Sequence, residues 1–281
     1  MGSGTEASMT ECTWDPGQYR QFGGERARPF YELIGRVRAV DPAFVADLGC
    51  GPGELTADLC RRWPAARVVG VDSSAEMIAA AGDVLSGLTE EGAPDASAPA
   101  AGRLSFELAD AWDWQPGMQV DVIVSNALLQ WIPGHERLLV RWLGMLADGG
   151  WLAFQVPANF DQPAHAVLRE LVASRRWRPL LGDVALNRQA ADPADYLDLL
   201  ASDSCEVDAW ETTYLHVLGG DDPVLRWYQG TGLRPVLAVL DPDRSAEFLA
   251  EYGELLRSAY PRARFGTVLP FRRVFVVAHR T

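Results

Sequence analysis

A glycine-rich turn, ADLGCGPG at residues 46–53, follows the first short apolar run of the chain. Gly49, Gly51 and Gly53 can adopt backbone torsions that are closed to other residues, and they let a ligand lie against bare main chain. The helix predicted to begin near Glu54 adds backbone N–H groups that have no partner inside the helix. A strand, turn and helix in this order are typical of a loop that holds a nucleotide-like ligand.

The spacing of the glycines excludes two common phosphate-binding loops. A dinucleotide-binding loop of the type G-x-G-x-x-G would need a third glycine where Glu54 stands, and a carboxylate there would face a pyrophosphate. A phosphate loop of the type G-x-x-x-x-G-K-[ST] needs a lysine, and the chain contains none. The turn therefore favours a nucleoside-like ligand without phosphates.

Three acidic residues stand at the ends of predicted strands beside this turn. Asp47 precedes the first glycine by two residues, Asp72 ends the second apolar run, and Asp110 follows the third. A carboxylate in the position of Asp72 can accept both hydroxyl groups of a ribose, and one in the position of Asp110 can accept the amino group of adenine. Each acid alone could equally cap a helix or close a turn. Together they favour an adenosine-binding site at one edge of a sheet.

The elements that must position these residues alternate between strand and helix patterns, which predicts an α/β fold with a mainly parallel sheet covered on both faces. Strands are predicted at residues 44–48, 68–71, 104–108, 120–124, 151–156, 205–218 and 274–278. Helices are predicted at residues 54–63, 133–146, 163–176 and 193–200, and from Asp241 onward. Ser73, three residues before Glu76, predicts a capping box for another helix. The segment 86–102, rich in Ala, Pro and Gly, predicts an exposed loop.

The composition limits the partners of the chain. Its 25 basic residues, all arginines, face 38 acidic ones, which gives a net charge of −13. An acidic chain without a dense basic block is a poor candidate for binding nucleic acid or an anionic membrane. The four cysteines form no C-x-x-C pair, so we expect free thiols, no metal site and no structural disulfide. With no signal-peptide pattern either, a cytoplasmic location is expected.

Two sets of motifs resemble known enzymes. The turn with an acid two residues before its first glycine resembles the class I S-adenosylmethionine-dependent methyltransferases, over about residues 40–156. Five further segments resemble the trans-aconitate 2-methyltransferase family over nearly the whole chain: WDPGQYRQFGGERARP, NALLQWIPGH, CEVDAWETTYLH, TGLRP and FRRVFVVAHR. The resemblance implies S-adenosyl-L-methionine as the cofactor. It also implies transfer of a methyl group to one carboxylate of trans-aconitate, which gives a monomethyl ester.

The resemblance also implies an architecture. The fold would be Rossmann-like, with a seven-stranded mixed sheet whose last strand is antiparallel and with helices on both faces. A single methyltransferase domain would span residues 14–281, with helical cap segments at about 14–38, 157–190 and 219–271. Residues 1–13 are expected to be a disordered tail or a remnant of cloning. The loop at 86–102 is longer than expected for the family.

The implied reaction joins a sulfonium cation and a carboxylate anion into neutral products. A carboxylic acid with a pKa near about 4 is already ionised at neutral pH, so we expect no general base and no catalytic side chain. The protein must instead position the reactants in a dry pocket, and arginine suits the grip on carboxylates because it binds them in a bidentate manner.

The predicted site residues fall into two groups. The cofactor site is expected to comprise Asp47, Gly49, Cys50, Gly51, Gly53, Asp72, Ser73, Met77, Asp110, Ala111 and Asn126. The substrate site is expected to comprise Tyr19, Arg26, Arg28, Gln130, Trp131, His165, Tyr214, Arg234 and Arg272. Each arginine alone could be structural, but at least two of the four should contact the substrate. The Asn126 amide can meet both the ammonium and the carboxylate of the methionine end of the cofactor.

Two alternatives stay open. The substrate could be another small carboxylic acid, or an acyl thioester on an acidic malonyl carrier protein. Such a carrier would need a basic face, and the only dense basic run is SRRWRP at residues 174–179, which a solvated helix end also explains. The chain could also be a module that binds S-adenosylmethionine without catalysis. That module would keep the glycine turn but would need no anion pocket.

Overall fold

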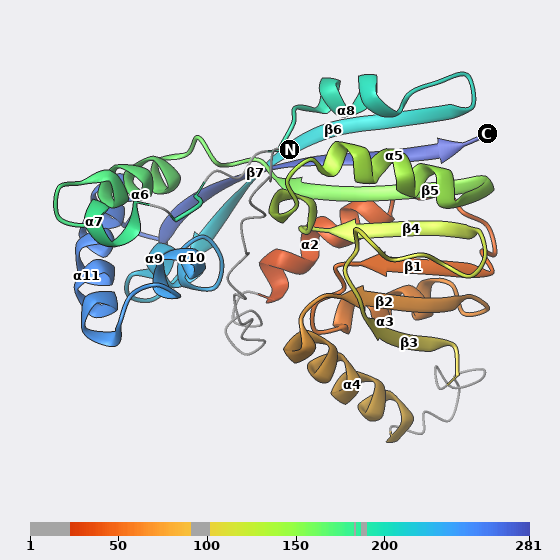
Figure 1. Cartoon of the computed structure of the whole chain (residues 1–281), viewed down its shortest axis with the longest axis horizontal. Coiled ribbons are helices and arrows are strands. Elements are labelled where there is room, and N and C mark those ends of the chain that lie inside the picture. The colour runs from red at the N-terminus through yellow and green to blue at the C-terminus, as the bar shows by residue number, and fades with distance from the viewer. Residues whose placement is uncertain (1–22, 91–101, 183, 187–189) are drawn as a thin grey trace, which may run out of the picture.

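The computed structural model describes residues 23–90, 102–182, 184–186 and 190–281. Their strands form one seven-stranded sheet in the order β3-β2-β1-β4-β5-β7-β6 (Figure 1). The strands are β1 (Phe44–Leu48), β2 (Arg67–Asp72), β3 (Leu104–Leu108), β4 (Val120–Asn126), β5 (Leu146–Pro157), β6 (Cys205–Leu218) and β7 (Thr267–Arg280). The pairs from β3 to β5 are parallel, whereas β7 runs antiparallel to both β5 and β6. The predicted mixed sheet with an antiparallel last strand is confirmed.

Some helices cover the two faces of the sheet, and others form a separate group beyond the carboxyl ends of the parallel strands (Figure 1). The helices are α2 (Gly23–Ile34), α3 (Glu54–Arg62), α4 (Ala75–Glu90), the 3₁₀ turn η1 (Leu129–Trp131), α5 (His135–Met145), α6 (Pro163–Ala173), α7 (Arg178–Leu181), α8 (Pro193–Leu200), α9 (Pro223–Gln229), α10 (Arg234–Leu237) and α11 (Pro242–Ala259). Helices α5 and α8 pack on one face, and α2 and α3 on the other. Because both faces are covered, all five residues of β1 are buried.

We call α6, α7, α9, α10 and α11 the cap. Their apolar side chains, among them Trp227 and Phe248, form a third buried cluster together with Trp177, which precedes α7, and the adjoining ends of β6 and β7. Figure 1 shows the cap beyond the end of the sheet to which the arrowheads of β1 and β4 point. Ligands of open α/β sheets bind outside the carboxyl ends of the parallel strands. The cap therefore adjoins the edge at which the sequence predicts the site.

Several element boundaries differ from the prediction. The residue that caps α4 is Ser74, because its Oγ accepts a hydrogen bond from the Met77 N–H (3.3 Å) and donates one to Glu76 (2.7 Å). The prediction of Ser73 as the capping residue is therefore wrong. Helix α4 continues to Glu90, so the first part of the predicted loop 86–102 is helical, and residues 91–101 lie outside the described residues.

Strand β7 is longer than predicted. It spans Thr267–Arg280 because it pairs with β6 along all of that strand, from Cys205 opposite Arg280 to Leu218 opposite Thr267. The long β6–β7 pair carries the chain from the sheet into the cap. Among the described residues, no helix combines the length and the hydropathy needed to cross a membrane.

Candidate active site

The glycine turn is held at the carboxyl end of β1 by hydrogen bonds to β2. The N–H groups of Gly49 and Cys50 both donate to the Val71 carbonyl, at 2.8 and 3.0 Å. Gly49, Gly51 and Gly53 have φ angles of +80°, +55° and +86°, in the left-handed region that other residues rarely adopt. Because nothing lies within 4 Å of an added Cβ at Gly51, the turn presents bare main chain to open space there.

Gly53 has a second role, in packing. A Cβ at this position would lie 2.8 Å from the Cβ of Ala81 on α4 and 2.8 Å from the Cζ of Phe106 on β3. The absence of a side chain therefore lets the start of α3 approach α4 and β3 closely. This contact fixes where the N-terminal end of α3 faces the turn.

Asp72 ends β2 beside the turn and is half-buried. Its Oδ2 accepts a hydrogen bond from the Gly51 N–H and its Oδ1 accepts one from the Ser74 N–H, both at 2.9 Å. Burial raises its pKa, and these backbone hydrogen bonds offset part of that effect. A carboxylate has about four lone-pair positions, so each oxygen keeps capacity for one more donor. Two ribose hydroxyls fit this requirement.

Asp47 lies deeper, at 2% exposure, at the end of β1. Its Oδ2 accepts a hydrogen bond from the Thr56 hydroxyl at 2.6 Å, whereas its Oδ1 is buried with no hydrogen-bond partner among the described residues. Burial raises the pKa of this carboxyl to about 7. Burial thus favours the protonated form of this carboxyl, and a donor or a positive charge from a ligand beside the turn would stabilise the ionised form.

The other predicted cofactor residues lie around the same edge. Cys50, Met77 and Ala111 are buried, and burial raises the pKa of the Cys50 thiol. Ser73 and Asp110 are exposed. The Asp110 Oδ1 accepts a hydrogen bond from the Trp112 N–H at 2.7 Å, so it already closes a turn, and its role toward adenine stays a prediction.

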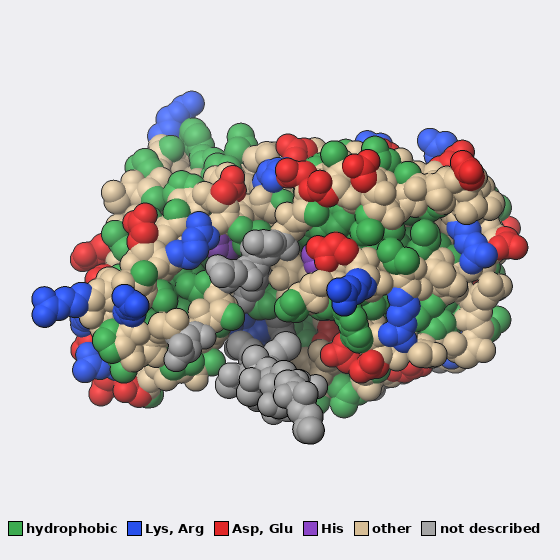
Figure 2. All heavy atoms as spheres, turned by 45° about the horizontal axis from the view of Figure 1, so that its top comes forward, with side chains coloured by type: hydrophobic (Ala, Val, Ile, Leu, Met, Phe, Trp, Pro, Cys, Tyr) green, Lys and Arg blue, Asp and Glu red, His purple; other side chains and the backbone are tan. Residues whose placement is uncertain are grey.

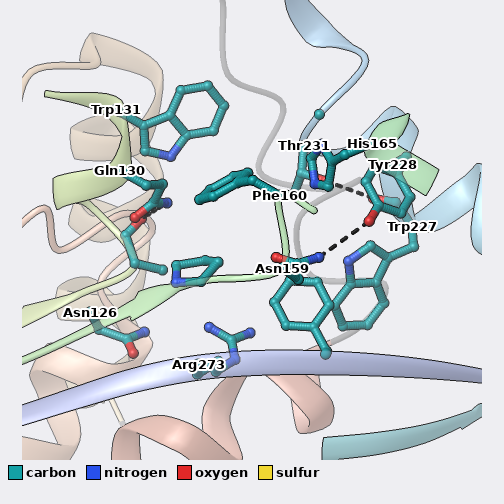
Figure 3. A pocket seen from close by; sticks show the side chains of 14 residues that line it. Asn126, Gln130, Trp131, Asn159, Phe160, His165, Trp227, Tyr228, Thr231 and Arg273 are labelled. Carbon is teal, nitrogen blue, oxygen red and sulfur yellow. Dashed lines mark hydrogen bonds between the residues drawn. The ribbon is translucent and has the colours of Figure 1, made fainter. Parts of the chain in front are cut away.

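A pocket lies between the carboxyl ends of the central strands and the cap (Figure 3). Including its part open to solvent, it measures about 670 Å³. Its lining comprises Asn126, Ala127, Gln130, Trp131, Pro157, Asn159, Phe160, His165, Trp227, Tyr228, Thr231, Gly232, Phe271 and Arg273. In Figure 3, Asn126, Gln130 and Trp131 stand on one side, and His165, Trp227 and Tyr228 stand across from them.

Arg273 is the charged side chain of this lining. It is 3% exposed, its NH1 donates to the Gln155 Oε1 at 3.0 Å, and its guanidinium lies 4.7 Å from the centre of the Phe271 ring. A buried guanidinium attracts an anion strongly, because there is little water to screen it. The pocket therefore suits a carboxylate ligand.

The neighbouring residue, Arg272, is not part of the pocket lining. Successive residues of a strand point to opposite faces, so Arg272 turns away from Arg273. Its NH2 forms ion pairs with Asp192 at 2.6 Å and with Glu211 at 2.5 Å. The structure thus places the predicted arginine in a surface ion-pair cluster and puts its neighbour in the pocket.

Arg28 and Arg234 also lie apart from the pocket lining. Arg28 is exposed, pairs with Glu32 at 2.8 Å and lies over the ring of Tyr214, whose hydroxyl donates to the same Glu32 at 2.6 Å. Arg234 begins α10, two residues after the lining residue Gly232. Tyr19 lies outside the described residues, and so does the side chain of Arg26.

Among the substrate candidates, Gln130, Trp131 and His165 do line the pocket, as does Asn126. His165 packs edge-on against Phe160 at 5.2 Å and Tyr228 at 5.1 Å between ring centres. His165 and Tyr228 belong to the cap, and they line the pocket together with Phe160, which precedes α6.

Sequence reasoning missed several lining residues, above all Asn159, Tyr228 and Arg273. Two signals could have found part of this set. The period of two in a strand separates Arg273 from Arg272, and the apolar partners of β7 show which face is buried. Asn159, which donates to the Tyr228 hydroxyl at 3.2 Å, is a polar residue two positions after the end of a buried strand.

Ala127 marks the pocket by its backbone. Its φ of +58° is unusual for a residue with a Cβ, and it follows directly after β4. The Gln130 Nε2 donates to the Ala127 carbonyl at 2.6 Å, which holds the turn in place. Backbone strain of this kind is concentrated at functional sites. Among the described residues, no group of three or more His, Cys, Asp or Glu side chains is arranged to hold a metal ion.

Comparison with known proteins places this geometry in a family. Residues 45–150 match the model of a methyltransferase domain. Among solved structures, the fold is similar to the YcgJ protein from Bacillus subtilis, with a TM-score of 0.53 and 14% identity, covering 90% of this chain and 98% of that one. It is also similar to a coclaurine N-methyltransferase, with a TM-score of 0.53 and 14% identity, covering 91% of this chain and 72% of that one.

Relatives found by sequence have a much higher identity to this chain than these solved structures do. A protein from Streptomyces avermitilis named trans-aconitate 2-methyltransferase is 51% identical over 271 residues, which cover 95% of this chain and 97% of that protein. A protein of the same name from Mycobacterium tuberculosis is 45% identical over 94% of this chain and 96% of its own length. The chain therefore belongs to the trans-aconitate 2-methyltransferase family.

Proposed function

We propose that the protein transfers the methyl group of S-adenosyl-L-methionine to one carboxylate oxygen of trans-aconitate. The methyl–sulfur bond breaks, a methyl–oxygen bond forms, and the products are the monomethyl ester and S-adenosylhomocysteine. No proton moves, because the sulfonium cation and the carboxylate anion neutralise each other. The observation that carries the proposal is the buried guanidinium of Arg273 in a pocket at the carboxyl edge of the sheet.

The residues beside the glycine turn fit the nucleoside of the cofactor. Asp72 has acceptor capacity for the ribose hydroxyls, and Gly51 offers main chain without steric obstruction. The unpaired Oδ1 of the buried Asp47 suits a ligand that brings a donor or a positive charge. When bound, the cofactor supplies an activated methyl group. The predicted roles of Cys50, Ser73, Met77, Asp110 and Ala111 remain part of this proposal.

The pocket beside Arg273 fits the acid. The protein has a net charge of −13, which repels a trianion at long range. Electrostatic attraction inside the pocket must therefore offset this repulsion. Arg273 supplies that local attraction in a nearly dry site, and the rings of Phe160, Trp227 and Tyr228 exclude water from the cap side. Because the reacting carboxylate is already ionised, the protein holds the reactants in line and needs no base.

A carrier-protein substrate finds less support. In the basic run at 174–179, Arg176 pairs with Glu247 at 2.5 Å and with Glu251 at 3.2 Å, both on α11. On the face shown in Figure 2, arginine side chains are interspersed with acidic ones. An acidic carrier would therefore meet mixed charges there and not a basic surface.

Methyl transfer can be tested directly. The purified protein is incubated with S-adenosylmethionine labelled in the methyl group and with a panel of di- and tricarboxylic acids and a malonyl carrier protein. The expected result is labelled monomethyl ester from trans-aconitate. Ester from the carrier substrate alone, from a different acid alone, or from none of them would overturn the proposal.

We also propose that the enzyme works in the cytoplasm on a small-molecule substrate, without nucleic acid or membrane as a partner. Cys50, Cys60 and Cys205 are free, buried thiols, which suits a reducing compartment.

A further inference from the structure

Two buried polar side chains, Gln155 and Arg273, and the half-buried Asn126 form a chain of hydrogen bonds across β4, β5 and β7. The Arg273 NH1 donates to the Gln155 Oε1 at 3.0 Å, and the Gln155 Nε2 donates to the Asn126 Oδ1 at 2.6 Å. Asn126 and Gln155 are register partners in the sheet, and Gln155 is completely buried. Arg273 and Asn126 both line the pocket, whereas Gln155 is behind them and not part of the lining.

The chemistry of the arginine fixes the direction of this chain. A guanidinium only donates hydrogen bonds, so Gln155 must turn its oxygen toward Arg273. The Gln155 nitrogen then faces Asn126, whose side-chain oxygen must accept this hydrogen bond. The Asn126 nitrogen is therefore left for the pocket, and Figure 3 shows it pointing into the space beside Arg273. The partners of this amide therefore set its orientation.

We propose that Gln155 is a positioning residue that makes the pocket-facing atom of Asn126 an N–H donor. Asn126 and Arg273 then form a two-part site for carboxylate oxygens, which only accept hydrogen bonds. This narrows the role expected for Asn126, because an ammonium group finds no acceptor there. The carboxylate can come from the methionine end of the cofactor or from the acid substrate, and the substrate case rests on the proposed function.

Gln130, elsewhere in the pocket lining, presents a hydrogen-bond acceptor, whereas Asn126 presents a donor. Its Nε2 is bound to the Ala127 carbonyl at 2.6 Å, so its Oε1 is the free atom, and this oxygen is buried with no partner among the described residues. The lining thus offers donors at Asn126 and Arg273, and acceptors without a partner among the described residues at the Gln130 Oε1 and the Asn159 Oδ1. A ligand with both an anion and a donor group would be oriented by this difference.

The variant Gln155→Glu tests the proposal in the full-length protein, because it replaces one NH₂ group by an oxygen of nearly the same size. The new carboxylate accepts from both neighbours, so it neutralises Arg273 and turns the Asn126 oxygen toward the pocket. The dissociation constants of S-adenosylhomocysteine, and of trans-aconitate in its presence, are measured by calorimetry. We expect at least a tenfold weakening, ~1.4 kcal/mol, for one of them, and the ligand affected identifies the source of the carboxylate.

Gln162→Glu is the matched control. It makes the same chemical change at the N-cap of α6, outside the pocket lining, and is expected to alter both constants less than about twofold. If Gln155→Glu retains the wild-type Tm and both constants stay within twofold of the wild type, the proposal is overturned.

A second test remains valid if Gln155→Glu does not fold. Asn126→Asp keeps the acceptor for Gln155 but replaces the pocket-facing donor by an anionic oxygen, so it should weaken the same ligand at least tenfold; unchanged affinity overturns the proposal.

A double-variant cycle separates positioning from a merely structural role. Asn126→Ala should weaken the affected ligand at least fivefold in the wild-type background and less than about twofold in the Gln155→Glu background. Equal losses in both backgrounds would overturn the coupling. Because binding of S-adenosylhomocysteine needs no turnover, this arm stands even if trans-aconitate is not methylated.

Discussion

Adjacent arginines on β7 give a sharp test of the substrate pocket. Arg273→Met removes the buried guanidinium that lines the pocket but keeps a long apolar side chain, while Arg272→Met makes the same change one residue away. Arg273 is 3% exposed, whereas the Arg272 side chain is 26% exposed and binds two surface carboxylates. Arg273→Met should therefore lower the rate of methyl transfer, whereas Arg272→Met should only remove surface ion pairs.

The expected sizes follow from these environments. A charge-assisted hydrogen bond in a buried site contributes about 1.5–3 kcal/mol, which corresponds to a loss of about 10- to 150-fold in kcat/KM at ~1.4 kcal/mol per factor of ten. Exposed ion pairs such as those of Arg272 contribute about 0–1 kcal/mol to stability. We therefore expect Arg272→Met to lower the free energy of unfolding by no more than about 1 kcal/mol. Because Arg272 does not line the pocket, kcat/KM should change by less than about threefold.

The assay is steady-state methylation of trans-aconitate at saturating S-adenosylmethionine, with calorimetric binding of S-adenosylhomocysteine as a check on the cofactor site. The Tm of both variants is recorded, because Arg273→Met also leaves the Gln155 oxygen without its donor. A loss of kcat/KM in Arg272→Met as large as that in Arg273→Met, with intact folding, would refute the assignment of the pocket arginine.

Three further changes test the rest of the site. Asp72→Asn should raise the dissociation constant of S-adenosylhomocysteine by about 10- to 100-fold, and unchanged calorimetric binding would disprove the ribose assignment. Gly53→Ala should lower the free energy of unfolding by about 2–4 kcal/mol in urea denaturation, because φ is +86° and the new Cβ meets Ala81 and Phe106 at 2.8 Å; full stability would contradict the packing role. The folded-state pKa of Asp47 is raised from 3.8 to about 7, so the folded protein holds a proton that the unfolded chain releases, and stability falls as the pH rises through this window. Asp47→Asn should remove that fall, and parallel pH profiles for the two proteins would contradict it.

Much of the fold could be predicted because its signals are local. The apolar runs of β1, β2 and β4, each buried on both faces, stand out from the polar turns between them. The strand boundaries were less predictable, since they depend on partners far away in the chain. Strand β7 is long because β6 pairs with all of it, and no property of its own residues indicates that length.

For the same reason, the glycine turn gives a clearer signal in the sequence than the lining of the substrate pocket does. The glycine turn is one continuous segment, and Asp72 reaches it from the neighbouring strand β2. The substrate pocket is assembled from η1, β7 and the cap, so its residues meet only in the folded chain. Arg272 and Arg273 are chemically identical in the sequence, and only the face of β7 that packs inward separates them.

A crystal structure of the protein with S-adenosylhomocysteine and trans-aconitate would show directly how the two ligands are held. The ribose hydroxyls should lie within hydrogen-bond distance of the Asp72 carboxylate, and a carboxylate of the acid should contact the Arg273 guanidinium. Electron density for the acid at Arg272 or elsewhere on the surface, with the pocket beside Arg273 left to water, would contradict it.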